Sequence, residues 1–94
     1  MTRRYYILAQ QQAVRAPNQL AWARWFRMTD VRERVVQNDQ LGEVYISTSF
    51  LGAEDQLFQT AVFGGALDGR TVYYHTYEEA QAGHTTIVDQ VRRA

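Results

Sequence analysis

Two histidines and one aspartate are the residues whose types suit acid–base chemistry. His84 falls on the apolar side of a helical pattern near the C-terminus. A buried imidazole there can act as a general base or a ligand or, more commonly, as a hydrogen-bonded core residue. His75 ends a predicted strand and could approach Asp68 across a hairpin. A small hydrolase that uses His75 and His84, with Asp68 as the acid, is therefore one hypothesis for the function.

The two histidines do not form a metal-binding pattern. His75 and His84 are nine residues apart, a spacing that matches no common ligand signature, and the chain has no cysteine. Thiolate zinc sites, disulfides and cysteine nucleophiles are thereby excluded. Gly64 and Gly65 belong to no phosphate-binding fingerprint. We predict no metal ion and no cofactor, and we favour a non-catalytic function over an enzymatic one.

The candidate binding residues are aromatic or planar side chains that can stack or bind anions. They are Trp22, Trp25, Tyr45, Arg70, Tyr73 and His75. Both tryptophans, with Phe26, form either a platform for a base or a peptide or, as a small domain more often requires, part of the core. The two tyrosines and His75 are predicted on the sheet face opposite the last helix. That face binds a partner unless the first helix or a second subunit covers it.

Composition indicates one globular domain, residues 1–94. Hydrophobic residues make up 46% of the chain and aromatic residues 13%, which is far from the composition of disordered proteins. Ten arginines balance ten acidic residues, and nothing in the pattern indicates a basic patch, so we do not expect a nucleic-acid partner. No apolar run approaches the roughly 18 residues that cross a bilayer. We therefore expect no membrane association and a cytoplasmic location.

Hydrophobic spacing predicts an α+β fold, in which an antiparallel sheet of four to five strands packs against a C-terminal amphipathic helix. Leu20, Trp22, Trp25 and Phe26 recur at helical spacing, which predicts a short aromatic helix over 18–28, with a strand as the alternative. The predicted strands are 5–8, 31–37, 43–51, 56–63 and 70–75, with turns at 38–42, 52–55 and 68–69.

The C-terminal helix has the clearest signal. Thr76 and Glu79 form a capping box, in which the Thr76 hydroxyl accepts from the Glu79 N–H and the Glu79 carboxylate accepts from the Thr76 N–H. Gly83 lies within the apolar stripe, where glycine costs about 1 kcal/mol relative to alanine. We infer that the helix approaches the sheet too closely at this point for a methyl group.

Four segments of the sequence resemble a family of small, uncharacterised bacteriophage and prophage proteins. They read WARWF (22–26), STSFLG (47–52), AVFGG (61–65) and YEEAQAGH (77–84). Their order and spacing cover almost the whole chain. The resemblance implies a phage gene product in the cytoplasm of an infected or lysogenic bacterial host, and it implies no assigned activity and no catalytic residue.

Three hypotheses for the function remain. The preferred one is a non-catalytic binding protein that acts on a host protein or through self-association as a homodimer, because no catalytic pattern is visible. The second is a protein that binds and sequesters a nucleotide or another small molecule, with Arg70 and Tyr73 in its pocket. The hydrolase is the third.

Overall fold

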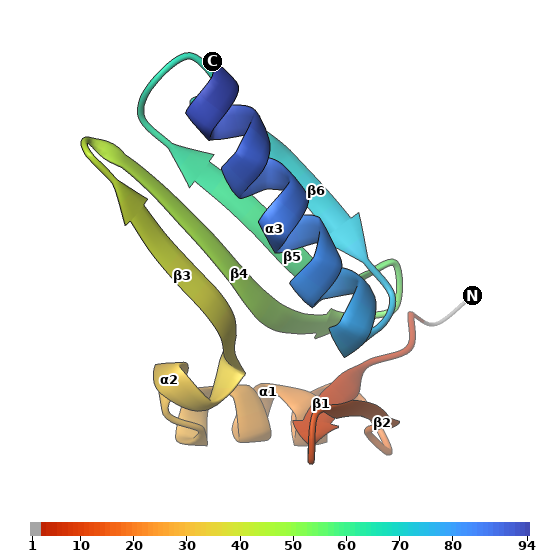
Figure 1. The fold of residues 1–94 in the computed structure, drawn as a ribbon. Helices are drawn as coiled ribbons and strands as arrows, with labels where there is room; N and C mark the ends of the chain where they lie inside the picture. The colour runs from red at the N-terminus through yellow and green to blue at the C-terminus, as the bar shows by residue number, and fades with distance from the viewer. Residues whose placement is uncertain (1–2) are drawn as a thin grey trace.

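Alternating inward and outward side chains build a four-stranded antiparallel sheet in the middle of the chain. The computed structural model describes residues 3–94 and orders the strands β3 (Val35–Leu41), β4 (Val44–Ala53), β5 (Gln56–Phe63) and β6 (Thr71–Tyr74) across this sheet (Figure 1). Each strand pairs with the next one along the chain, as short connections between antiparallel strands allow. β3 and β6 are therefore the two edges of the sheet.

One face of this sheet carries the core. Along β4, Ile46, Thr48 and Phe50 point to this face and are buried, whereas the residues between them are only half-buried. Helix α3 (Tyr77–Arg93) lies across the same face (Figure 1) and adds Ile87 to the buried apolar cluster. The α+β fold with an antiparallel sheet packed against a C-terminal amphipathic helix is confirmed.

Helix α3 begins at the predicted cap. The Thr76 hydroxyl oxygen accepts a hydrogen bond from the backbone N–H of Glu79 at 3.1 Å. The reciprocal bond differs from the prediction, because the Glu79 carboxylate accepts from the Thr76 hydroxyl, also at 3.1 Å, rather than from its backbone N–H. Arg92 and Arg93 in the last turn place positive charge near the negative end of the helix dipole.

Gly83 allows α3 to pass close to the sheet. A Cβ atom on Gly83 would overlap the aromatic ring of Tyr74, which comes from β6. The predicted close approach is therefore confirmed, and the neighbour is a tyrosine ring rather than strand backbone. Substitution by any larger residue requires this ring to move.

The first third of the chain gathers at one end of the sheet (Figure 1). A hairpin of β1 (Tyr6–Ala9) and β2 (Gln12–Arg15) leads into α1 (Gln19–Met28) and the single turn α2 (Val31–Arg34). The hairpin contacts β4, and α1 contacts the hairpin. These elements extend the core beyond the N-terminal end of α3.

The aromatic helix predicted over 18–28 is confirmed as a helix, and its tryptophans face the core. Trp25 packs edge-on against Phe50, with ring centroids 5.7 Å apart. The Trp22 indole N–H donates to the carbonyl of Leu51 at 3.2 Å. The tryptophans thus join α1 to the sheet instead of forming an open platform.

Several predicted boundaries are wrong. The segment 31–37 begins with α2 and becomes strand only at Val35. The predicted turn 38–42 is strand as far as Leu41, and the turn itself consists of Gly42 and Glu43. The described residues form six strands in two sheets, because the predicted first strand pairs in a separate hairpin and not in the main sheet.

Candidate functional site

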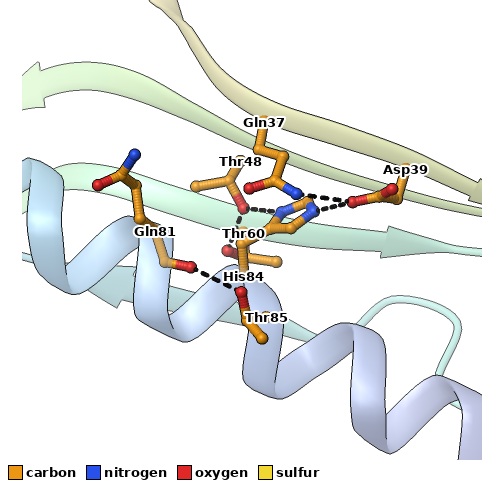
Figure 2. Close-up of polar contacts among 7 residues, drawn as sticks. All are labelled: Gln37, Asp39, Thr48, Thr60, Gln81, His84 and Thr85. Atoms are coloured by element: carbon orange, nitrogen blue, oxygen red, sulfur yellow. Dashed lines mark hydrogen bonds and ion pairs between the residues drawn. The ribbon is translucent and has the colours of Figure 1, made fainter.

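His84 is the centre of a chain of buried polar side chains between α3 and the sheet. Its Nδ1 atom lies 2.6 Å from Thr48 Oγ1, and its Nε2 atom lies 2.7 Å from Asp39 Oδ2. Thr48 Oγ1 is also hydrogen-bonded to Thr60 Oγ1. Figure 2 shows the imidazole between these partners, which come from β3, β4 and β5. These hydrogen-bonded side chains therefore connect α3 to three neighbouring strands.

The Asp39 carboxylate fixes one of the donors in this chain. A carboxylate only accepts hydrogen bonds, so His84 Nε2–H donates to Asp39. Nδ1 is hydrogen-bonded to the Thr48 hydroxyl, whose oxygen is also hydrogen-bonded to the Thr60 hydroxyl. Each of these buried polar groups has a partner in this arrangement, which removes the cost of burying them unpaired.

Asp39 is the solvent-facing end of the chain, with a side chain that is 37% exposed. The hydrogen bond from His84 lowers the pKa of the Asp39 carboxyl below its ordinary value, and the Gln37 amide, which donates to the same carboxyl at 3.1 Å, and the positive charge of Arg92 act in the same direction. Partial desolvation opposes this shift of the Asp39 pKa. The ionised carboxylate therefore accepts from His84 Nε2–H.

The sequence hydroxyl, imidazole, carboxylate is also the order found in hydrolase triads. A nucleophile, however, must reach its substrate. Thr48 and His84 are 0% exposed and Thr60 is 1% exposed, so no substrate reaches either hydroxyl in this structure. The geometry supports a stabilising role for this chain in the core and does not form an open catalytic centre.

The three residues of the hydrolase hypothesis are not brought together. Asp68 lies in the loop before β6 and its carboxylate accepts from the Gly64 N–H at 2.6 Å. His75 follows β6, so the four residues of that strand, about 13 Å of extended chain, separate it from Asp68. His84 bonds to Asp39 instead. No group of three histidine, aspartate or glutamate side chains suited to a metal ion occurs within residues 3–94.

Sequence reasoning missed Asp39, because 38–42 is rich in residues that favour turns. The alternation of side chains along β4 places Thr48 on the same strand face as Ile46 and Phe50. A threonine at an inward position needs a buried partner, and this was the available signal for Thr48 and, on the next strand, for Thr60. The pairing of Asp39 with a histidine 45 residues away could not be read from local pattern.

The opposite face of the main sheet is uncovered, and three rows of side chains cross it. The central row holds short side chains, one from each strand: Asn38, Ser47, Ala61 and Thr71. The aromatic residues of this face lie in the two flanking rows. One flanking row holds Gln40, Tyr45 and Phe63, and the other holds Val35, Ser49, Gln59 and Tyr73. We call these eleven residues the open face. None of them is buried and none is charged.

The open face contains two of the predicted binding residues. Tyr45 lies beside Phe63, with ring centroids 6.2 Å apart, and Tyr73 lies on β6 with 44% of its surface exposed. His75 lies past the end of β6 and lines a crevice with Gln12 and other residues near the N-terminus of α3. Of the six predicted residues, only the two tyrosines are placed within the open face.

Arg70 is exposed in the loop that leads into β6. It lines none of the three crevices described for residues 3–94. Tyr73 lines none of them either, so these two residues share none of the described crevices.

The chain matches no protein-family model, no curated protein and no solved structure in our comparisons. The resemblance to phage and prophage proteins therefore stays a prediction from sequence. Within residues 3–94, no helix has both the length and the apolar character needed to cross a membrane.

Proposed function

We propose that this chain is a non-catalytic binding protein that works as a homodimer, with the open faces of two copies packed together. The observation that carries the proposal is that eleven residues across one face of the four-stranded sheet are neither buried nor charged, although 21% of the residues in the chain are charged. Centres of protein interfaces are depleted in charge and enriched in tyrosine and phenylalanine. The open face is uncharged and carries two tyrosines and one phenylalanine.

The relief of the open face favours a second copy as the partner. Its short central row, which includes Ser47 and Ala61, lies between rows that carry Tyr45 and Phe63 on one side and Tyr73 on the other. In a two-fold arrangement, the aromatic rows of each copy can lie over the short row of the other. A two-fold interface requires such self-complementarity.

Charge and area are consistent with the same partner. Two identical faces without charged groups meet without repulsion, whereas a strongly acidic or basic partner would gain no ion pair there. Four strands about 4.8 Å apart and roughly seven residues long give a face on the order of 400–500 Å² in projection. Side-chain relief increases the accessible area toward the roughly 800 Å² per partner of ordinary stable interfaces.

Sedimentation equilibrium of the full chain and of two matched variants tests the proposal. Ala61→Arg places a long charged side chain in the central row, where two copies would bring equal charges together. Ala82→Arg makes the same change on the exposed side of α3. We expect a dimer mass for the wild type and Ala82→Arg, and a monomer mass for Ala61→Arg, with far-ultraviolet circular dichroism spectra unchanged.

A wild-type chain that remains monomeric at concentrations near 100 µM, where even a weak interface is populated, contradicts the homodimer. Equal dissociation of both arginine variants also contradicts it, because the effect would then come from overall charge. Should Ala61→Arg fail to fold, Phe63→Gln at the 54% exposed Phe63 replaces it, with the same expectation.

A further inference from the structure

The net charge of zero hides an uneven distribution of charge along the chain. Residues 1–37 contain seven arginines and two acidic residues, whereas 38–94 contain three arginines and eight acidic residues. The first part therefore carries a net charge of +5 and the second −5. Because β1, β2, α1 and α2 lie together at one end of the molecule (Figure 1), the arginines are gathered there, contrary to the sequence expectation.

Partner groups divide these seven arginines into two sets. Four have partners within the described residues: Arg3 with Asp55 at 2.6 Å, Arg4 with Glu54 at 3.7 Å, Arg32 with Asp30 at 3.1 Å, and Arg34 over the Phe26 ring at 3.9 Å. The other three, Arg15, Arg24 and Arg27, are exposed and form no ion pair within residues 3–94. They supply an uncompensated positive charge.

Two of these arginines project from the outer side of α1. Arg24 and Arg27 are three residues apart and so lie on one helix face. Leu20 and Met28, which are 66% and 80% exposed, share that side. Trp25 is on the opposite side, against the core. The outer side of α1 therefore presents two arginines together with two exposed apolar side chains.

The third arginine lies at the other end of α1. Arg15 lines a crevice of about 150 Å³ together with Arg3, Arg4 and Tyr5, next to the first residues of the helix. The first turn of α1 contains no acidic residue, and the neutral side chain of Asn18 caps it by accepting from the Ala21 N–H. Positive groups therefore lie at both ends of α1, which spans about 15 Å.

We propose that this basic end, the described residues 3–37, binds the phosphate backbone of nucleic acid. Arginine pairs with phosphate in a bidentate manner, and an exposed, unpaired arginine can release condensed counterions on binding. Asp55 and Glu54 pair with Arg3 and Arg4 and reduce the net charge of this end from +5 to +3, and the three unpaired arginines keep it positive. Charges more than about 8–10 Å away are screened at physiological salt. The inference is independent of the homodimer.

An anionic membrane surface is the main competing partner. Helices that lie in a membrane interface present tryptophan, phenylalanine or several leucines to the lipid. In α1 the tryptophans face the core. The large apolar side chains exposed at the basic end are Val14, Leu20, Met28 and Val31, which include one leucine and no aromatic ring. The observations therefore favour nucleic acid.

Fluorescence anisotropy with labelled single-stranded and double-stranded oligonucleotides of mixed sequence tests the proposal on the full chain. The plot of log affinity against log salt concentration should have a slope of about −2 for single strands and about −3 for duplex, as three phosphate contacts require. Arg24→Glu with Arg27→Glu should weaken binding about tenfold or more. Arg92→Glu with Arg93→Glu, the same charge change at the far end of α3, should leave it within about twofold.

Three results would overturn the proposal: no binding to either oligonucleotide at low salt, equal weakening by the two double variants, or binding to phosphatidylserine vesicles without binding to oligonucleotides. The third result would assign the basic end to membranes. Should Arg24→Glu with Arg27→Glu fail to fold, Arg15→Gln should still lower affinity and reduce the salt slope by about one.

Discussion

His84 Nε2 lies 2.7 Å from Asp39 Oδ2, and this contact joins the C-terminal helix to the edge strand β3. Because the imidazole also bonds to Thr48 in the neighbouring strand, one side chain satisfies polar groups on both sides of it. The helix can therefore cover the sheet across this polar patch with His84, Thr48 and Thr60 all hydrogen-bonded.

Replacing the imidazole should destabilise the fold strongly. His84→Ala removes a fully buried side chain and leaves the Thr48 hydroxyl without its imidazole partner, so we expect a loss of about 2–4 kcal/mol in unfolding free energy. Urea unfolding of the variant and the wild type measures this loss. Thr86→Ala, on the exposed side of the same helix, should change the free energy by no more than about 0.5 kcal/mol. A comparable loss in both variants would show that the polar chain contributes little.

The Asp39–His84 pair should also make stability depend on pH. The pKa of Asp39 is lowered in the folded chain, so the unfolded chain binds this proton more tightly. The contribution is complete above the ordinary carboxyl pKa of about 4 and is lost as the pH falls through the lower, folded-state pKa.

Asp39→Asn isolates this contribution, because the other carboxyls titrate equally in both chains. The wild type should be more stable than the variant at about pH 6, and the difference should shrink toward about pH 2. A difference that stays constant or grows on acidification would mean that the ionised carboxylate is not what stabilises the pair.

Gly83 should resist a substitution that usually stabilises helices. Alanine gains about 1 kcal/mol over glycine in a helix interior, but its methyl group would meet the Tyr74 ring. We expect Gly83→Ala to lower the unfolding free energy by about 1–3 kcal/mol. In a Tyr74→Leu background the same change should be neutral or favourable. A more stable Gly83→Ala single variant would show that the ring moves aside freely.

Much of the fold was predictable where local signals agree with tertiary packing. The capping residues Thr76 and Glu79 indicate where the helix 77–93 begins, and strand Gln56–Phe63 has its predicted bounds. The hairpin β1–β2 was not predictable, because Gln10 and Gln11 form its turn at φ values of 51° and 64°. Such positive φ angles normally select asparagine or glycine.

The candidate sites were also predictable only in part. Alternation along β4 indicates that Tyr45 faces away from Ile46, and the structure places it so. The partner of His84 depends on the register between β3 and β4, where Asp39 lies opposite Ile46. That register follows from a turn at Gly42 and Glu43, which the surrounding polar residues obscure.

The arrangement of helices in the dimer tests the central claim most directly. The chain has no cysteine, so Gln81→Cys on the exposed side of α3 gives one site for a nitroxide spin label, far from the open face. If the open faces pack together, the two α3 helices lie on the outside of four layers about 10 Å apart. Pulsed double electron–electron resonance should then give an interspin distance no shorter than about 30 Å. A distance below about 20 Å, or no dipolar coupling at concentrations that populate a weak dimer, would contradict packing through the open face.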